Sequence, residues 1–437
     1  MNHSEILSRF NIDALNKMQV DVGKAIIDNN SVVLISPTGS GKTLAFLLPL
    51  LRLINSQANN TQALILVPSR ELAIQIEQVF KQMKSGLSIT CCYGGHSTQI
   101  EKNNLDANPH IVVGTPGRIA HHIKRGTISS LTIHTLILDE FDKSLQEGFH
   151  QEMSFIINYL RNITKRILTS ATELKLIPDF VGIENPTVLD FTTPSQDTKP
   201  TLKMKFTRAK GVDKFNALFL LLGSIGNQSK IVFCNHRDTV ERISEQLTKL
   251  TIEHGIYHGG LEQIDREKTL IKLRNGSIQL IVTTDLASRG LDIPELEAIV
   301  HYQLPTTQDV MIHRNGRTAR MNASGTAYFL LDEGDYLPPF LDTKPEEIDL
   351  PKKLIIPEPC NWKTLYIAAG KKDKINKMDI VGMLLKKGGL QKEELGKIEV
   401  LDHSAYAAIK SDKIVNTLDM VRNEKIKNRK IKMEISS

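Results

Sequence analysis

The stretch SVVLISPTGSGKTLAFLLPLL, residues 31–51, decides the fold, because an apolar run, a glycine-containing loop and a second apolar run follow one another without a break. The first run is continuous and β-branched, which is typical of a strand buried on both faces of a parallel sheet. Gly39 and Gly41 allow loop conformations in which successive N–H groups converge on phosphate oxygens. Strand, loop and helix in this order predict a phosphate-binding loop in an α/β domain.

The side chains of the loop indicate how it would hold a nucleotide. Lys42 is expected to neutralise the β- and γ-phosphates, and the hydroxyl of Thr43 is expected to ligate magnesium. The common pattern opens with glycine where this chain has serine, a change that we expect the loop to tolerate. A chance glycine turn is the alternative, and the strand and helix around the loop argue against it. The predicted ATP-binding residues of the loop are Ser36, Pro37, Thr38, Gly39, Ser40, Gly41, Lys42 and Thr43.

Three carboxylates, Asp139, Glu140 and Asp142, follow the apolar run TLIL. A magnesium ion at such a loop needs a second anchor, usually an Asp at the end of a neighbouring parallel strand. Asp139 is in that position, and Glu140 is then the candidate to polarise the attacking water. An acidic helix start, favoured by the helix dipole, is the alternative; it could explain Asp142 but not Asp139 at a strand end.

The chain has 437 residues, of which 41% are hydrophobic, and this indicates about three globular domains. Its most apolar run, LAFLLPLL, is shorter than the roughly 18 residues that would span a bilayer. No secretory leader is recognisable, so we expect a cytoplasmic protein that acts as a monomer and does not contact a membrane. The four cysteines lack metal-ligand spacing and are expected to be structural.

Apolar strand-like runs alternate with helical segments, which predicts parallel sheets with crossover helices. Two proline-bearing polar stretches, residues 192–201 and 344–361, predict the breaks between domains. The expected fold is therefore two tandem parallel-sheet α/β domains followed by a small α+β domain. The expected bounds are 1–195, 196–345, a linker over 346–362, and 363–437.

Several motifs occur in an order that resembles the DEAD-box RNA helicases of helicase superfamily two. The sequence DEFD stands where that family has Asp-Glu-Ala-Asp. The resemblance implies two RecA-like domains that bind ATP and Mg²⁺ between them and act on RNA. The other motifs are PSRELAIQ (68–75), the glycine pair 94–95, TPGR (115–118), SAT (170–172), IVFCN (231–235), QIDR (263–266), TTDLASRGLDIP (283–294) and HRNGRTAR (313–320).

The resemblance also implies residue roles around the nucleotide. Arg317 and Arg320 would be arginine fingers that stabilise the charge of the phosphoryl-transfer transition state. The coupling of ATP to RNA would involve Ser170, Thr172 and His313, the last linking the acidic motif to SAT. Further nucleotide contacts would come from Gln19, which reads adenine, and from Gly290 and Asp292, the latter accepting from the ribose.

Four positions depart from the family pattern. Ile12 stands where the family has an aromatic residue that stacks on adenine, and Phe10 lies two residues further back. Phe141, Asn315 and Ala319 replace the usual Ala, Ile and Gly. None of these changes removes a charge or a phosphate donor, so we expect tuned activity.

RNA contacts in the family come from motifs that position the sugar-phosphate chain without reading its bases. An isolated arginine is more often part of a surface salt bridge, but here the arginines lie within ordered motifs. The resemblance implies local separation of short duplexes, and no processive translocation follows from it. The implied contacts are Pro68, Arg70, Gly94, Gly95, Thr115, Pro116, Gly117, Arg118, Arg266, Thr284 and Arg289.

The basic charge of the chain is concentrated at its C-terminal end. Residues 360–437 carry 17 Lys and Arg against 10 Asp and Glu, whereas the rest of the chain carries 38 against 39. A basic domain on a neutral body is typical of a nucleic-acid-binding appendage, although a solvated face is the alternative.

This segment predicts the order βαββαβ of an RRM, with its last strand at RKIKMEI. Tyr366 and Tyr406 would lie on its first and third strands, where they could stack on RNA bases or simply pack. The segment more closely resembles the RNA-binding domain of the DbpA subfamily, which implies a hairpin of large-subunit ribosomal RNA as its target. The candidate contacts are Tyr406, Lys371, Lys372, Lys374, Lys427, Arg429 and Lys430.

The favoured function is thus an ATP-dependent RNA helicase acting in ribosome assembly. A nucleotide-gated RNA clamp without strand separation is one alternative, which Glu140, Arg317 and Arg320 argue against. A DNA-directed motor of the same superfamily is another, which the RRM-like segment argues against.

Overall fold

The structure is a computed structural model of the whole chain, and it consists of two compact units. One unit holds a seven-stranded sheet, and the other holds a second seven-stranded sheet together with a C-terminal four-stranded sheet. The fold class expected from the sequence is confirmed. The residues described are 3–37, 39–95, 97–173, 176–192, 202–288, 296–318, 325–341, 343–353, 355–427 and 429–436.

The first sheet is parallel throughout, with the strand order β3-β4-β2-β5-β6-β1-β7. Its strands are β1 (Ser31–Ile35), β2 (Ala63–Leu66), β3 (Ile89–Cys92), β4 (Ile111–Gly114), β5 (Thr135–Leu138), β6 (Lys165–Ser170) and β7 (Thr187–Asp190). Its helices are α1 (His3–Ser8), α2 (Lys17–Asp28), α3 (Lys42–Leu53), α4 (Arg70–Met83), α5 (Thr98–Asp106), α6 (Pro116–Lys124), α7 (Phe141–Gln146), α8 (His150–Tyr159) and the 3₁₀ turn η1 (Asp179–Val181).

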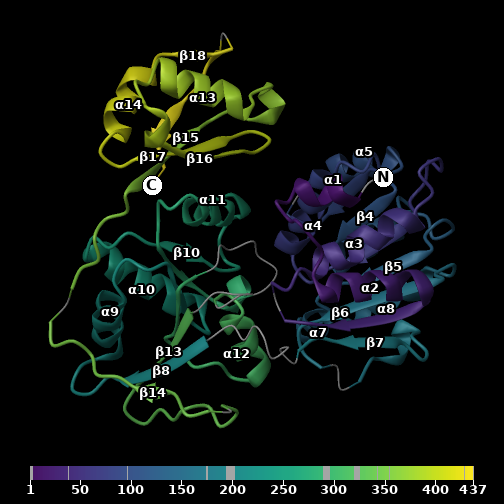
Figure 1. Cartoon of the computed structure of the whole chain (residues 1–437), viewed down its shortest axis with the longest axis horizontal. Helices are drawn as coiled ribbons and strands as arrows, with labels where there is room; N and C mark the ends of the chain where they lie inside the picture. Colours follow the sequence, from purple (N-terminus) through teal and green to yellow (C-terminus); the bar gives the residue numbers. More distant parts are fainter. Residues whose placement is uncertain are drawn as a thin grey trace. The chain divides into compact units, whose positions relative to one another are not determined.

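Both faces of this sheet are covered by helices, which explains its continuous apolar strands (Figure 1). Alternate residues of β1 point to opposite faces: Val32 and Leu34 join a core with α1 to α4, whereas Val33 and Ile35 join a core with α5 to α8. Burial on two faces leaves only the strand ends available for polar chemistry. The candidate sites therefore lie where the strands end.

The second sheet is also parallel, with the order β10-β11-β9-β12-β13-β8-β14. Its strands are β8 (Leu202–Arg208), β9 (Lys230–Phe233), β10 (Gly255–Tyr257), β11 (Leu280–Thr283), β12 (Ala298–His301), β13 (Gly325–Leu331) and β14 (Glu346–Glu347). Its helices are α9 (Lys214–Ile225), α10 (Arg237–Lys249), α11 (Gln263–Arg274), α12 (Gln308–Asn315) and the 3₁₀ turn η2 (Asp285–Ser288).

The C-terminal domain has an antiparallel sheet with the order β16-β17-β15-β20. Its strands are β15 (Trp362–Ile367), β16 (Leu395–Val400), β17 (Ala405–Lys410) and β20 (Met433–Ile435), and its helices are α13 (Lys377–Lys386) and α14 (Ile414–Val421). Two 3₁₀ turns, η3 (Lys371–Asp373) and η4 (Lys392–Glu394), and a hairpin of β18 (Lys425–Ile426) and β19 (Arg429–Lys430) complete it.

The last expected strand, RKIKMEI, is wrong as a single element. Arg429 and Lys430 belong to the separate hairpin and are exposed, whereas Met433 begins the strand that joins the main sheet and is buried. The basic pair cannot enter the apolar layer that Met433 fills, so the segment divides between them. Among the described residues, no helix is both long and apolar enough to cross a membrane.

Candidate nucleotide-binding and RNA-binding sites

The predicted motifs of the first unit follow six neighbouring strands, at the edge where parallel strands end. The loop of residues 36–43, DEFD and SAT follow β1, β5 and β6, which are adjacent in the sheet. The motifs PSRELA, the glycine pair and TPGR follow β2, β3 and β4, which are adjacent in the other half. One edge of the sheet thus has a half suited to nucleotide and a half suited to RNA.

The ammonium group of Lys42 contacts the described start of the phosphate-binding loop. Lys42 Nζ donates to the carbonyl oxygens of Ser36 (2.6 Å) and Pro37 (3.1 Å), and only 8% of the residue is exposed. Gly39 and Gly41 have φ values of 83° and 92°, in the left-handed region that favours glycine. Both positions thus have a backbone conformation that favours glycine, and phosphate binding by the loop stays a prediction.

Gln19 joins the segment before α2 to this loop. Its Nε2 donates to the carbonyl of Gly41 (3.3 Å), and its Oε1 accepts from the N–H of Asn16 (3.1 Å) in a capping box. Asn16 Nδ2 in turn donates to the carbonyl of Ser40 (3.1 Å). A Cβ on Gly41 would lie 2.5 Å from Gln19 Nε2, so a side chain there would push Gln19 away. Sequence reasoning missed Asn16, although an Asn three residues before Gln at a helix start is a capping signal.

The acidic motif is buried at the end of β5. Asp139 is 3% exposed and accepts a hydrogen bond from the Thr169 hydroxyl. Burial, with the neighbouring charge of Glu140, raises the pKa of Asp139 from 3.8 to about 6. Glu140 has a φ of 49° and accepts from the fully buried Lys143 Nζ (2.8 Å). A buried carboxylate is a suitable cation ligand, because the positive charge of the cation offsets the free-energy cost of burying the negative charge.

The donor set fits magnesium by its chemistry. Thr43 and Asp139 offer a hydroxyl and a carboxylate, the hard oxygen ligands that Mg²⁺ prefers. Thr43 is the second residue of α3, which follows β1, and Asp139 follows β5. Both strands pair with β6. The two residues assigned to magnesium from the sequence thus belong to the same half of the sheet edge.

The motif SAT is linked directly to DEFD. Thr172 Oγ1 donates to Asp142 Oδ2 (3.3 Å), and Ser170 Oγ donates to the carbonyl of Thr172 (2.6 Å). Phe141, which replaces the usual Ala, is fully buried in the core under the motif. The replacement therefore fills apolar space and leaves the carboxylates where they are. Lys143 was not among the residues predicted from the sequence.

In the RNA half, the glycine pair accommodates an arginine. Arg70 opens α4, and a Cβ on Gly95 would lie 2.6 Å from its Nη1. Gly95 also has a φ of 86°. Pro68 precedes the N-cap Ser69, whose hydroxyl accepts from the N–H of Leu72 (3.3 Å). The structure thus brings Arg70 and the pair 94–95 together, as their shared role predicts.

TPGR forms the first turn of α6. Thr115 is the N-cap, its N–H donates to the carbonyl of Cys92 (3.1 Å), and Pro116 and Gly117 follow it. Arg118, predicted to contact phosphate, donates through Nε to the buried carboxylate of Glu101 (2.5 Å), and 14% of its side chain is exposed. Sequence reasoning missed Glu101.

In the second unit, QIDR opens α11 after β10, and Thr284 follows β11. Arg266 is 6% exposed.

A residue that we did not predict, Arg314, connects the motifs of this unit. Its guanidinium pairs with Asp285 (2.5 and 3.1 Å) and donates to Asn235 Oδ1 (2.7 Å), and the side chain is fully buried.

Two neighbours of Arg314 had predicted roles. His313 and Arg317 are buried, at 0% and 1% exposed. Asn315, which replaces the usual Ile, pairs through Oδ1 with His301 Nε2 (3.0 Å). His301 stacks on Phe329, and burial lowers the pKa of this histidine to about 3. Asn315, which departs from the family pattern, therefore hydrogen-bonds to a histidine that burial keeps neutral.

Five predicted residues lie outside the described part of the chain. They are Thr38, Arg289, Gly290, Asp292 and Arg320. Ala319 also lies there.

The sheet of the C-terminal domain packs one face on its own helices and the other on the second sheet domain. Arg274 at the end of α11 donates twice to the carboxylate of Glu399 on β16 (2.9 and 2.7 Å). Thr364 on β15 accepts from Asn275 Nδ2 (2.9 Å) and donates to Ser277 Oγ (2.8 Å).

This contact changes the expectation for Tyr406. Its ring lies 5.4 Å from that of Tyr366, its cross-strand partner, and only 2% of Tyr406 is exposed. Burial and the nearby carboxylates Glu267 and Asp265 of α11 raise its pKa. In this arrangement a base has no access to Tyr406, so the packing alternative fits the structure and the predicted stacking contact does not.

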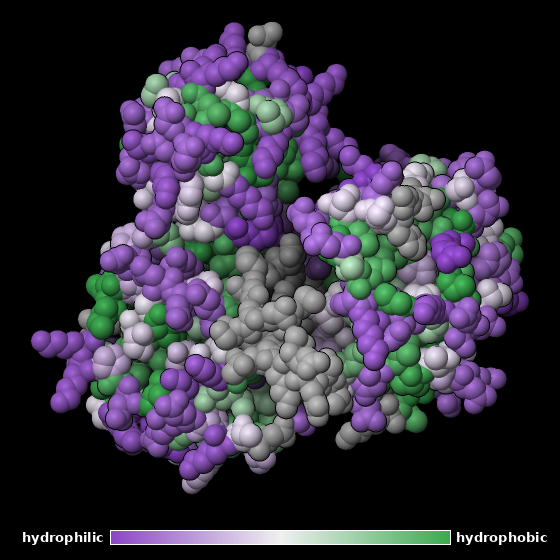
Figure 2. All heavy atoms as spheres, in the orientation of Figure 1, coloured by the Kyte–Doolittle hydropathy of each residue, from purple (hydrophilic) through white to green (hydrophobic). Residues whose placement is uncertain are grey.

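The basic candidates lie together on another part of the domain. Lys427 in the β18–β19 hairpin donates to the carbonyl of Lys374 (2.7 Å), and Arg429 pairs with Asp373 (3.6 Å). These contacts place the hairpin beside η3, which carries Lys371 and Lys372. Lys430 belongs to the same hairpin. Hydrophilic side chains cover most of the visible face of this domain (Figure 2).

Comparison with known proteins matches each part of the chain to a family. Residues 16–175 match the DEAD/DEAH box helicase family, residues 213–322 the helicase conserved C-terminal domain, and residues 364–435 the DbpA RNA binding domain.

Relatives cover nearly the whole chain. It is 32% identical over 421 residues to the ATP-dependent RNA helicase DbpA of Escherichia coli, which covers 94% of this chain and 92% of that protein. It is 30% identical to the protein of the same name from Bacillus subtilis, with 95% and 94% covered. Among solved structures, S. cerevisiae Dbp5 bound to RNA and ADP BeF3 is similar with a TM-score of 0.68 and 25% identity, covering 79% of this chain and 92% of that one.

Proposed function

Because the chain belongs to the DEAD-box ATP-dependent RNA helicases of the DbpA type, we propose that it uses ATP and Mg²⁺ to remodel ribosomal RNA during assembly of the large ribosomal subunit. The observation that carries the proposal is the divided edge of the first sheet, with the acidic motif and phosphate-binding loop in one half and three RNA motifs in the other. The protein would act in the cytoplasm as a monomer.

In the nucleotide half, each residue has a distinct task. Magnesium, when bound with ATP, supplies positive charge to the phosphates, and Thr43 and Asp139 would hold it. Lys42 would exchange the loop carbonyls for phosphate oxygens. Glu140 would orient the attacking water and take its proton, while Lys143 fixes the carboxylate at 2.8 Å. Arg317 and Arg320 would stabilise the charge of the transition state.

In the RNA half, the contacts would hold one strand by its backbone. Arg70 lies against the glycine pair 94–95, and TPGR at the start of α6 would add contacts to the same strand. Arg266, Thr284 and Arg289 would continue the path on the second unit. Contacts of this kind separate a short duplex locally, because they fix the shape of one strand and ignore its sequence.

The C-terminal domain would select the RNA. Its basic candidates gather at η3 and the β18–β19 hairpin, whereas its sheet face is engaged by the second sheet domain. We propose that Lys371, Lys372, Lys374, Lys427, Arg429 and Lys430 bind a hairpin of large-subunit ribosomal RNA.

Steady-state ATPase of the full chain with Mg²⁺ tests the proposal, with large-subunit ribosomal RNA compared against an equal mass of unrelated RNA. We expect ribosomal RNA to stimulate turnover at lower concentration. In the double variant Lys371→Glu and Lys372→Glu this preference should disappear, whereas the control Lys392→Glu, an exposed lysine in η4, should keep it. Equal stimulation of the unaltered protein by both RNAs would remove the ribosomal assignment and leave the helicase.

A further inference from the structure

A buried carboxylate, Glu101, lies between the RNA motifs of the first unit, and no task has been given to it so far. We propose that Glu101 is a positioning residue for RNA: it holds Arg118 and the start of the glycine pair in the arrangement that binds the strand. This inference rests on the proposed function, because it concerns the same RNA half of the sheet edge.

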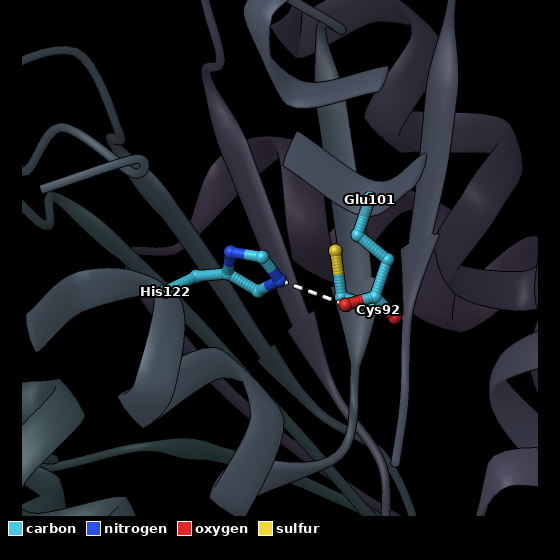
Figure 3. A group of neighbouring side chains, drawn as sticks. All are labelled: Cys92, Glu101 and His122. Carbon is cyan, nitrogen blue, oxygen red and sulfur yellow. Dashed lines mark hydrogen bonds and ion pairs between the residues drawn. The ribbon is translucent and has the colours of Figure 1, made fainter. Parts of the chain in front are cut away.

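The carboxylate has three partners, one in the turn after β3 and two in α6. Glu101 Oε1 accepts from the backbone N–H of Tyr93 (2.9 Å). Oε2 accepts from Arg118 Nε (2.5 Å). The same oxygen pairs with His122 Nε2 (2.8 Å), as Figure 3 shows. Glu101 is fully buried, and His122 is 1% exposed.

The positions of these partners in the chain give the arrangement its meaning. Tyr93 directly precedes Gly94 and Gly95, and Arg118 ends TPGR. His122 lies one turn further along α6, and Thr127 fixes the other side of its ring through Nδ1 (2.9 Å). One side chain on α5 therefore ties the glycine turn after β3 to the first two turns of α6.

The electrostatics favour a charged Glu101. Burial alone would raise the pKa of this carboxyl, but the hydrogen bonds from His122, Tyr93 and Arg118 together hold the pKa below its usual range. Charge-assisted bonds of this kind are short and directional. Glu101 therefore holds Arg118 through Nε of its guanidinium, and the direction of that group depends on the charge of Glu101.

A metal ion is the competing explanation for this cluster, because Cys92, Glu101 and His122 have ligand atoms within 4.8 Å of one another. Two observations disfavour it. Arg118 donates to the carboxylate oxygen that also faces His122, and a cation there would meet its positive charge. Burial raises the pKa of the Cys92 thiol, which opposes the thiolate that zinc requires. The cluster is better explained as an ion-pair network.

The test compares Glu101→Gln with unaltered protein, both as the full chain. Gln has the same shape, but it loses the charge and turns an N–H₂ group toward one of the donors. We expect the RNA concentration for half-maximal ATPase stimulation to rise about tenfold or more. The KM for ATP and the turnover at saturating RNA should stay within about twofold. Glu77→Gln, which alters the surface pair Glu77–Lys81 of the same domain, is the matched control and should behave as unaltered protein.

A double-substitution cycle separates positioning from general damage to the fold. If Glu101 acts through Arg118, the RNA concentration for half-maximal ATPase stimulation should be the same for Arg118→Ala as for the double variant. The double variant carries both Arg118→Ala and Glu101→Gln. Should Glu101→Gln fold poorly, His122→Gln provides the second variant, since its amide can still donate to the carboxylate. It is expected to raise the RNA requirement less than threefold.

Each other outcome is decisive. If unaltered protein responds to RNA and Glu101→Gln needs no more RNA than it does, the positioning role is overturned while the proposed function stands. If unaltered protein shows no response to any RNA, the proposed function fails first. If purified protein carries one equivalent of zinc and a chelator raises its RNA requirement, the cluster is a metal site and the inference is overturned.

Discussion

Asp139 and Glu140 are adjacent in sequence, yet their carboxylates have different partners. Asp139 accepts from a neutral hydroxyl, that of Thr169, whereas Glu140 accepts from the ammonium of Lys143. Glu140 has a left-handed φ of 49°, directly after the end of β5. Unequal surroundings of this kind suit the two tasks proposed for these acids, a cation ligand and a base.

Replacing Glu140 tests its role as the base. We expect Glu140→Gln to lower the RNA-stimulated turnover number by at least about 100-fold, because an amide cannot take a proton from water. ATP affinity, measured by equilibrium binding, should change less than threefold. Glu147→Gln, an exposed residue just after α7, should leave both quantities unchanged. Normal turnover in Glu140→Gln would refute the assigned mechanism.

Replacing Asp139 should abolish activity and raise the stability of the fold. Its pKa is raised on folding from 3.8 to about 6, so its contribution to stability is fully present below pH 3.8 and is lost as the pH rises through 6. At pH 8 the ionised group therefore destabilises the fold. Asp139→Asn should raise the free energy of unfolding at pH 8 by on the order of 3 kcal/mol, and by much less at pH 4.

Denaturant unfolding at the two pH values, without nucleotide, measures this difference. The same variant should lose its magnesium-dependent ATPase. Ligand binding by an ionised Asp139 also predicts that the apparent affinity for Mg²⁺ in the unaltered protein falls as the pH drops below about 6. Equal stability of the two proteins at pH 8 would show that the buried charge is fully compensated.

At the scale of elements, both parallel-sheet domains have a lysine at the start of a strand that donates to carbonyl groups at the end of a helix. Lys165 opens β6, and its buried ammonium donates to carbonyl oxygens at the end of α2, those of Asn29 (2.7 Å), Ile27 (3.4 Å) and Ile26. Lys230 opens β9 and donates to the carbonyl of Gly226 after α9 (2.5 Å). Each lysine satisfies groups that a helix leaves without partners at its C-terminus.

Lys165→Met tests this device. The apolar side chain fills similar space but leaves several buried carbonyls without a donor. We expect the free energy of unfolding to fall by about 2–4 kcal/mol. Lys24→Met, an exposed lysine on α2 itself, is the control and should change it by less than about 0.5 kcal/mol. A loss no larger than that of the control would show that water replaces the ammonium.

The elements themselves were largely predictable, because their signals are local. The run TLIL and the glycine loop can each be recognised from a few consecutive residues. The βαββαβ order of the C-terminal domain is confirmed, with the hairpin β18–β19 inserted before the last strand. The interactions between elements were not predictable. Glu101 lies in the polar stretch TQIEKNNLD, where a surface helix would be expected, and its partners come from other elements. The domain bounds and the site roles stay predictions.

At the scale of the molecule, α11 connects two RNA-directed parts of the second unit. The helix begins with the motif QIDR and ends at Arg274. The guanidinium of Arg274 forms a bidentate ion pair with Glu399 of the C-terminal domain. The two side chains are only 18% and 19% exposed, so their pairing is protected from solvent. A partly buried bidentate pair should fix the orientation of the domain better than an exposed one.

Reversing the charges tests this contact. Arg274→Glu should speed proteolytic cleavage in the proline-rich segment 344–361 by about fivefold or more, because two carboxylates then face each other across the contact. The double variant Arg274→Glu and Glu399→Arg should return the rate to within about twofold of unaltered protein. Arg237→Glu, whose partner Asp238 is highly exposed, is the control. Failure of the double variant to restore the slow rate would show that the ion pair does not hold the domain.

The covered sheet face also bears on how this protein could be recombined with its relatives. A C-terminal domain transplanted from another helicase would bring its own residues to positions equivalent to Thr364 and Glu399, and these would meet an unmatched turn at residues 274–277. A working chimera would therefore need the end of α11 to be exchanged together with the domain. The C-terminal domain and the turn at residues 274–277 that contacts it are therefore expected to be inherited together.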